Sequence, residues 1–162
     1  AVTGVQTCAL PIYPLIRAGS MMGGPVMRLQ GLTTVLDTPD GMLTALDDVG
    51  FEIGRGECFA LVGESGCGKS MAALSVMRLL PEVGQIVGGE VHLQGVELLG
   101  LPEVAMRSIR GRRVAMIFQE PSTALNPVLS IGRQIVEVIE RHGQHAARTA
   151  REQALEIGRA HG

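Results

Sequence analysis

An eight-residue segment at positions 63–70 constrains the fold of this chain more than any other feature. It fits the pattern G-x-x-x-x-G-K-[ST] at every fixed position. The apolar run Cys58–Val62 precedes it, and a helical apolar pattern over Lys69–Leu80 follows it and stops at Pro81. A strand, a glycine-rich turn and a helix in this order predict an α/β fold with a phosphate-binding loop. The segment consists of Gly63, Glu64, Ser65, Gly66, Cys67, Gly68, Lys69 and Ser70.

The residue types in this segment suit the binding of a nucleotide such as ATP with Mg²⁺. Glycines let the backbone wrap so that successive N–H groups point at phosphate oxygens, and the following helix presents its positive end to the anion. We expect Lys69 to reach the β- and γ-phosphates and the Ser70 hydroxyl to ligate Mg²⁺. Lys69 is the single lysine among 14 basic residues, which sets this position apart. The alternative is a glycine-rich turn that caps an ordinary helix.

Composition narrows the class of protein. A chain of 162 residues with 46% apolar and 19% charged residues is long and apolar enough for one folded domain. The formal net charge of −2 provides no basic field, so we expect no nucleic-acid partner. No apolar run approaches the roughly 18 residues that cross a bilayer. Three cysteines without CxxC spacing argue against a disulfide framework or zinc site and favour a cytosolic setting.

The two ends of the chain do not fit the pattern of the rest. Residues 1–12 carry no charge, and residues 2–12 resemble the translation of a common sequencing adapter. Residues 157–161 resemble the same adapter read on the other strand; coincidence is the alternative, and Gly162 does not fit the adapter's continuation. We therefore expect a non-native or disordered arm at 1–20, the domain at 21–156 and an adapter-like tail at 157–162.

Between these ends, strand-like and helix-like segments alternate. Strands are predicted at Val26–Leu36, Met42–Ile53, Cys58–Val62, Gly84–Leu99 and Val114–Phe118, with a turn at 38–41. Helices are predicted at Lys69–Leu80, Pro102–Arg110, Ser130–His142 and Ala146–Glu156, with Ser130 as an N-cap. The uninterrupted apolar runs CFALV and VAMIF are typical of strands buried on both faces of a parallel sheet. This order predicts an α/β sheet with a small β-rich lobe at the N-terminal end.

Gln119 is a second candidate site residue, because a neutral amide at the end of the VAMIF strand can reach Mg²⁺ or an attacking water without adding charge. The residues around Gln119, together with those around the glycine-rich loop, resemble a known family. GECFALVGESGCGKS and IFQEPSTALNPVLSIGRQI resemble the phosphate-loop and glutamine-loop regions of ABC transporter ATP-binding subunits, in the dipeptide/oligopeptide/nickel importer branch. The resemblance covers about Met27–Glu156.

This resemblance implies a fold and a set of roles. The fold is an incomplete P-loop NTPase core with an N-terminal antiparallel β lobe and the start of a helical subdomain, so that 21–156 is the N-terminal part of an ABC nucleotide-binding domain. Residues 63–70 become the Walker A loop, and Gln119 a catalytic residue that senses Mg²⁺ and the γ-phosphate. Leu36 falls where an aromatic residue normally stacks on adenine, which leucine cannot reproduce. The resemblance also implies that the loop Glu120–Pro127 contacts the coupling helix of a permease subunit.

The same resemblance implies a second ATP-binding subunit, bound head-to-tail, and a peripheral location on the inner face of the cell membrane. No Leu-Ser-Gly-Gly-Gln signature, Walker B sequence or switch histidine follows Gln119, so ATP hydrolysis is expected of the full-length subunit and not of this fragment alone. Two alternatives stay open: another P-loop enzyme such as a small kinase, or a truncated chain without turnover. The arginines between 107 and 113 are interpreted as a solvated basic face.

Overall fold

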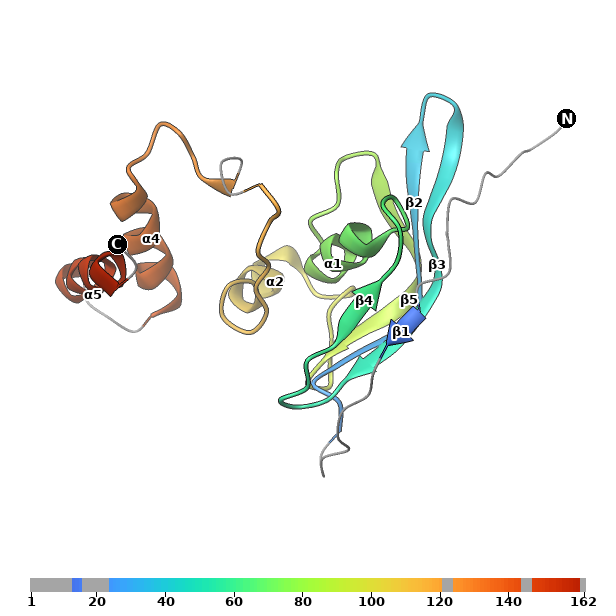
Figure 1. Cartoon of the computed structure of the whole chain (residues 1–162), viewed down its shortest axis with the longest axis horizontal. Helices are drawn as coiled ribbons and strands as arrows, with labels where there is room; N and C mark the ends of the chain where they lie inside the picture. Colours follow the sequence, from blue (N-terminus) through green and yellow to red (C-terminus); the bar gives the residue numbers. More distant parts are fainter. Residues whose placement is uncertain (1–12, 16–23, 121–123, 144–146, 161–162) are drawn as a thin grey trace, which may run out of the picture. The chain divides into compact units, whose positions relative to one another are not determined.

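The computed structural model describes residues 13–15, 24–120, 124–143 and 147–160. The chain forms two compact units, 1–102 and 103–162, which are described separately (Figure 1). Among the described residues, no helix has both the length and the apolar character needed to span a bilayer.

The first unit is organised around a four-stranded antiparallel sheet. In the order β3-β2-β5-β6, its strands are Gly41–Ile53, Met27–Thr38, Gly84–Leu93 and Val96–Glu97. The β2–β3 hairpin turns at Pro39 and Asp40, where the Thr38 hydroxyl donates to the Gly41 carbonyl at 2.6 Å. The N-terminal β lobe and its turn, both predicted from the sequence, are confirmed.

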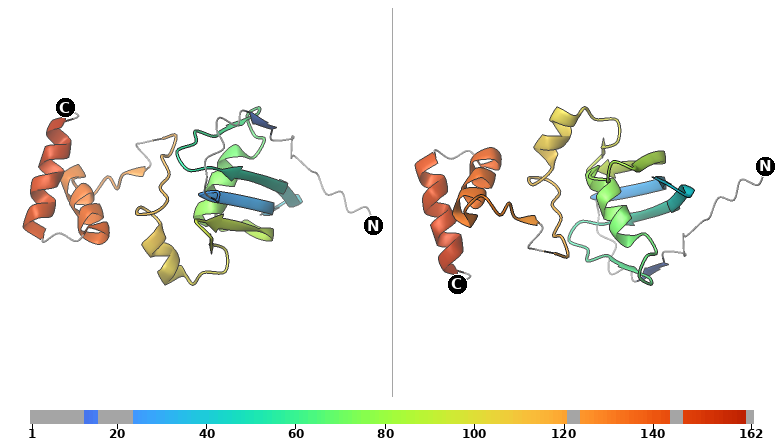
Figure 2. Two further views of the ribbon diagram at one scale, coloured as in Figure 1. Left: turned by 90° about the horizontal axis from the view of Figure 1, so that it is seen from below. Right: turned by 90° about the horizontal axis from the view of Figure 1, so that it is seen from above.

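Helix α1 (Lys69–Met77) lies across one face of this sheet (Figure 2). Its buried side chains are Ala72, Ser75, Val76 and Met77. The sheet contributes fully buried leucines and valines to the core: Leu29, Leu32, Leu46, Val91 and Leu93. Burial of this apolar surface is the main source of stability for the unit.

Helix α1 ends earlier than the apolar pattern predicts. Arg78 adopts a left-handed conformation with φ +51°, and its backbone N–H bonds to the carbonyls of Leu74 and Ser75. This is a C-terminal capping arrangement, and it occurs here without glycine. The Arg78 guanidinium also donates to the Leu98 and Leu101 carbonyls, at 3.2 and 2.6 Å. These tertiary contacts end the helix before Leu80.

A single polar pair crosses from the helix to the sheet inside this core. The hydroxyls of Thr34 and Ser75 are 2.9 Å apart, and both residues are 0% exposed. Ser75→Ala leaves the Thr34 hydroxyl buried and unpaired, so we expect a loss of about 1–3 kcal/mol in the free energy of unfolding. Thr34→Val combined with Ser75→Ala removes both polar groups and should cost clearly less than the two single changes added together. Urea denaturation followed by circular dichroism measures this; strict additivity would contradict it.

The strand before the glycine-rich loop is shorter and more exposed than the sequence predicts. Strand β4 is only Ala60–Val62, and it pairs antiparallel with β1 (Tyr13–Leu15). Its burial alternates, Val62 is 48% exposed, and Cys58 is also exposed. The prediction of a strand buried on both faces of a parallel sheet was therefore wrong for these residues, because double burial needs a layer on each face and parallel neighbours.

Within its described residues, the second unit has three helices. They are α2 (Glu103–Ile109), α4 (Ile131–His142) and α5 (Ala147–Ala160). As predicted, the Ser130 side chain caps α4 by accepting from the Arg133 N–H at 3.3 Å, and the helix ends at His142. Helix α5 packs against α4 and buries Ala150 and Ala154.

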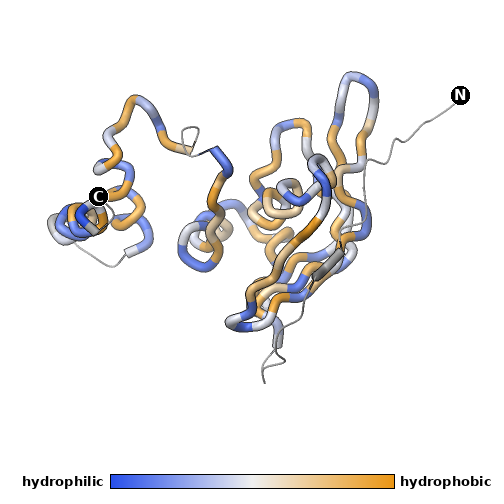
Figure 3. Tube along the Cα trace, viewed as in Figure 1, coloured by the Kyte–Doolittle hydropathy of each residue, from blue (hydrophilic) through white to orange (hydrophobic). Residues whose placement is uncertain are grey.

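The VAMIF segment was predicted as a buried strand, and this prediction was wrong. Val114 forms an isolated bridge with Arg110, and the residues after it have no strand partner among the described residues. Ile117 is 97% exposed and Phe118 is 43% exposed. In Figure 3 this part of the chain is coloured as a hydrophobic stretch that gives way to a hydrophilic one. An apolar run becomes a buried strand only where neighbouring strands take its hydrogen bonds.

Candidate functional site: the glycine-rich loop before α1

The loop at 63–70 forms a tight turn that buries the Cys67 side chain. The Cys67 N–H bonds to the Glu64 carbonyl at 3.3 Å, and the Cys67 side chain is only 1% exposed. Gly66 and Gly68 have φ values of +85° and +93°, where side chains other than glycine are strained. Gly63, Glu64, Ser65, Gly66 and Ser70 are exposed. The loop therefore presents its backbone outward and keeps its thiol inside.

Gly68 is also required by a close approach between the loop and strand β3. A Cβ at this position would lie 2.6 Å from the Ala45 carbonyl oxygen and 3.0 Å from Leu46 Cδ2. At Gly66, by contrast, a Cβ would meet nothing within 4 Å. The contact with β3 thus fixes the end of the loop, where helix α1 begins.

The first turn of α1 offers unpaired donors to an anion. Its hydrogen-bond ladder begins with the Ala72 N–H, which bonds to the Gly68 carbonyl at 2.8 Å. Backbone N–H groups ahead of that bond have no helical carbonyl to reach, and Gly68, the N-cap, has no side chain to satisfy them. These donors and the positive end of the helix dipole favour a phosphate group there.

Lys69 folds back over the loop. Its Nζ donates to the carbonyls of Gly63 and Glu64 at 2.8 and 2.5 Å, and to Cys67 Sγ at 3.2 Å. An ammonium group has three donors, and here each has an acceptor within the loop. The cation is therefore held within the loop by the carbonyls of Gly63 and Glu64, two residues that are exposed.

The other predicted site residues belong to other segments of the chain. Leu36 is on β2, opposite Leu43 and Gly84, and a Cβ on Gly84 would lie 3.3 Å from its Cδ2. Gln119 is exposed and belongs to the second unit. Of the loop Glu120–Pro127, residues 121–123 lie outside the described residues. Adenine binding at Leu36, magnesium sensing at Gln119 and permease contact through this loop stay predictions.

Gln134 holds the end of that loop, a role that sequence reasoning missed. From α4, its side-chain amide accepts from the Asn126 N–H at 2.9 Å and donates to the Asn126 and Leu129 carbonyls, both at 3.0 Å. The Asn126 side chain also accepts from the Val128 N–H at 3.0 Å. A glutamine on a helix gives no sequence signal for such a contact, because its partners are backbone atoms of another segment.

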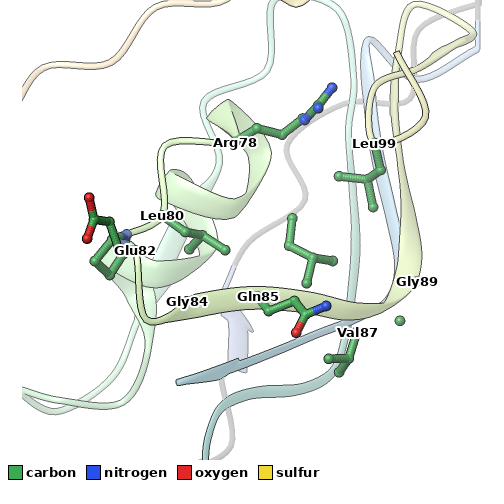
Figure 4. A pocket seen from close by; sticks show the side chains of 11 residues that line it. Arg78, Leu80, Glu82, Gly84, Gln85, Val87, Gly89 and Leu99 are labelled. Atoms are coloured by element: carbon green, nitrogen blue, oxygen red, sulfur yellow. The ribbon is translucent and has the colours of Figure 1, made fainter. Parts of the chain in front are cut away.

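A separate cavity of about 640 Å³ lies in the first unit between the end of α1 and strand β5. Figure 4 shows Leu80 and Leu99 on its two sides, over Gln85 and Val87 of β5. None of its lining residues belongs to the phosphate loop. Among the described residues, no group of three or more histidine, cysteine or acidic side chains is arranged to hold a metal.

A short strand, a glycine-rich loop that exposes backbone donors, and a helix begun by Lys69 and Ser70 define an incomplete α/β P-loop NTPase core. Comparison with known families then gives the identity. The pattern of the family described as ABC transporter matches residues 46–160, and the chain belongs to this family.

Curated relatives and solved structures agree with this assignment. A Sinorhizobium fredii protein named as a probable peptide ABC transporter ATP-binding protein is 46% identical over 133 residues, covering 82% of this chain and 40% of the relative. A Brucella abortus protein named as a peptide import ATP-binding protein is 41% identical over 138 residues, covering 85% and 42%. The chain thus spans about two fifths of these relatives' length.

The fold has counterparts among solved structures. One is described as a dimeric bacterial ABC transporter cassette, and another as a dimeric post-hydrolysis state of an ATP-binding cassette bound to ADP and Pi. Each superposes with a TM-score of 0.67 at 24% identity, covering 80% of this chain and 54% of the other. About half of the fold of such a cassette is therefore present in this chain.

Proposed function

We propose that this chain is part of the ATP-binding subunit of an ABC importer for peptides or a similar small solute, and that its loop at 63–70 binds MgATP. The single observation that carries the proposal is the geometry of the loop. Lys69 Nζ is bonded to the Gly63 and Glu64 carbonyls, and these residues are exposed to solvent, where an anion can reach them. The peptide assignment is supported by what the curated relatives are named for. The residues that carry the nucleotide-binding proposal all lie within 21–156.

The proposed role of each loop residue in binding MgATP follows from the hydrogen-bond donor or metal ligand that it provides. The N–H groups of the loop and of the first turn of α1 would hold phosphate oxygens. Lys69 would exchange its bonds with the Gly63 and Glu64 carbonyls for bonds with the β- and γ-phosphates, which are stronger because both partners are charged. The exposed Ser70 hydroxyl would ligate Mg²⁺, which supplies charge neutralisation between those phosphates.

The remaining roles concern the full-length subunit. There Gln119 would approach Mg²⁺ and the γ-phosphate, and Leu36 would pack against adenine without aromatic stacking. The loop Glu120–Pro127 would contact a permease subunit, and a second ATP-binding subunit would complete the nucleotide site head-to-tail on the inner face of the membrane. Hydrolysis is proposed for that longer protein and not for the 162-residue chain alone.

Removal of the Ser70 hydroxyl tests the proposed nucleotide site. Ser70→Ala should abolish the part of ATP affinity that depends on Mg²⁺, because the variant lacks the protein ligand to the ion, while metal-free binding through Lys69 and the loop amides persists. Binding of a fluorescent ATP analogue is measured with Mg²⁺ and with EDTA, on the native chain and the variant. Ser65→Ala, on the same exposed loop, is the matched control. Equal Mg²⁺ enhancement in native and Ser70→Ala chains would refute the assignment.

A further inference from the structure

Another cavity, of about 310 Å³, lies within the second unit, and basic side chains form most of its lining. Its walls come from α2, from the turn after it and from the last turn of α4. The lining residues are Val104, Arg107, Ser108, Arg112, Arg141 and His142, which we call the basic pocket.

Backbone contacts fix the shape of the basic pocket. The Ile109 carbonyl accepts from the N–H groups of Arg112 and Arg113 at 3.2 and 2.8 Å, so the turn that carries Arg112 is closed. This turn lies against the end of α4, since a Cβ on Gly111 would come within 2.8 Å of His142 Nε2. Arg112 and Arg141 therefore reach one cavity from segments 29 positions apart in the sequence.

The positive charge in the basic pocket is only partly compensated. Glu103 pairs with Arg110 at 2.6 Å and with Arg107 at 3.5 Å. The hydrogen bond from Arg110, together with the charges of Arg110 and Arg107, holds the pKa of Glu103 below its ordinary value. Among the described residues, neither Arg112 nor Arg141 has a carboxylate within 4 Å. Two guanidinium groups thus line the cavity without an internal counter-ion.

We propose that the basic pocket binds a phosphate group, supplied either as free phosphate or by the head group of an anionic lipid. Planar guanidinium groups match phosphate oxygens in paired hydrogen bonds, and Arg112 and Arg141 have this geometry to offer. The volume is near the lower end of about 300–1,000 Å³ for small-ligand sites, which suits a compact anion. Arg107 and Arg112, two arginines of the cluster expected from the sequence as a solvated face, thus line this cavity.

The test uses the whole chain carrying Lys69→Ala, so that the nucleotide loop does not contribute the signal. In that background, R112Q/R141Q removes the two uncompensated arginines. The matched control, R133Q/R159Q, removes the same charge from two exposed arginines of α4 and α5 that do not line the cavity. One probe is inorganic phosphate, followed through the NMR signals of the ¹⁵N-labelled backbone amides of Val104, Ser108 and His142, which every variant retains. The other is sedimentation with phosphatidylglycerol vesicles, compared with phosphatidylcholine vesicles.

We expect saturable binding of at least one probe, weakened roughly tenfold or more by R112Q/R141Q and changed less than about twofold by the control. A phosphate response without vesicle binding identifies free phosphate as the source, and preferential sedimentation with phosphatidylglycerol identifies the lipid head group. The absence of saturable binding to both probes, or equal losses in both double variants, would overturn the proposal. Because Lys69 is replaced in every chain compared, these outcomes do not depend on the proposed nucleotide site.

Discussion

Lys69→Ala is expected to weaken MgATP binding about 10- to 100-fold, equivalent to about 1.5–3 kcal/mol. The physical reason is the loss of the ammonium group that the structure holds within the loop, 2.8 and 2.5 Å from the Gly63 and Glu64 carbonyls. No other lysine exists in the chain to take its place. Titration with a fluorescent ATP analogue measures the change.

The control for this experiment is Arg55→Ala, which removes one exposed positive charge from the same unit. The MgATP affinity of Arg55→Ala should match that of the native chain. This would separate the loss of the Lys69 contact from a general effect of removing one positive charge. Circular dichroism spectra of both variants check that the fold is retained. Unchanged affinity in folded Lys69→Ala would remove the basis of the phosphate-loop assignment.

The second large effect concerns the backbone of the loop. Gly68→Ala should lower the free energy of unfolding of the first unit by about 2–4 kcal/mol, because two costs coincide there. One is a φ of +93°, and the other is a Cβ placed 2.6 Å from the Ala45 carbonyl oxygen. Urea denaturation followed by circular dichroism, together with hydrogen exchange of the β3 amides, measures the loss.

Gly66→Ala provides the matched comparison. Its φ of +85° imposes a similar conformational cost, but a Cβ there meets nothing within 4 Å. We expect a loss of only about 1 kcal/mol in the free energy of unfolding. Equal destabilisation by the two substitutions would show that the contact between Gly68 and β3 contributes nothing.

The conformation of the glycine-rich loop and the helix after it could be predicted from the sequence because their cause is local. Glycines at 66 and 68 permit positive φ, and the helix start follows from the apolar pattern beginning at Lys69. Ser130 was recognised as a cap for the same reason, since its partner is three residues away.

The two uninterrupted apolar runs show where this reasoning stops. CFALV contributes the partly exposed strand β4, and VAMIF leaves Ile117 97% exposed. Hydrophobic residues make the burial of a segment favourable in free energy. The neighbouring strands that bury it, however, come from other parts of the chain. Periodicity alone carries no information about those neighbours.

For this protein, the sequence by itself determined the family and the glycine-rich loop before α1, because these depend on residue types at fixed spacing. Only the tertiary structure decided that Gly68 lies against Ala45, that Thr34 pairs with Ser75 inside the core, and that Arg112 and Arg141 share a cavity. Each of these contacts joins residues more than 20 positions apart. Such pairs are set by the packing of whole elements, which no local pattern encodes.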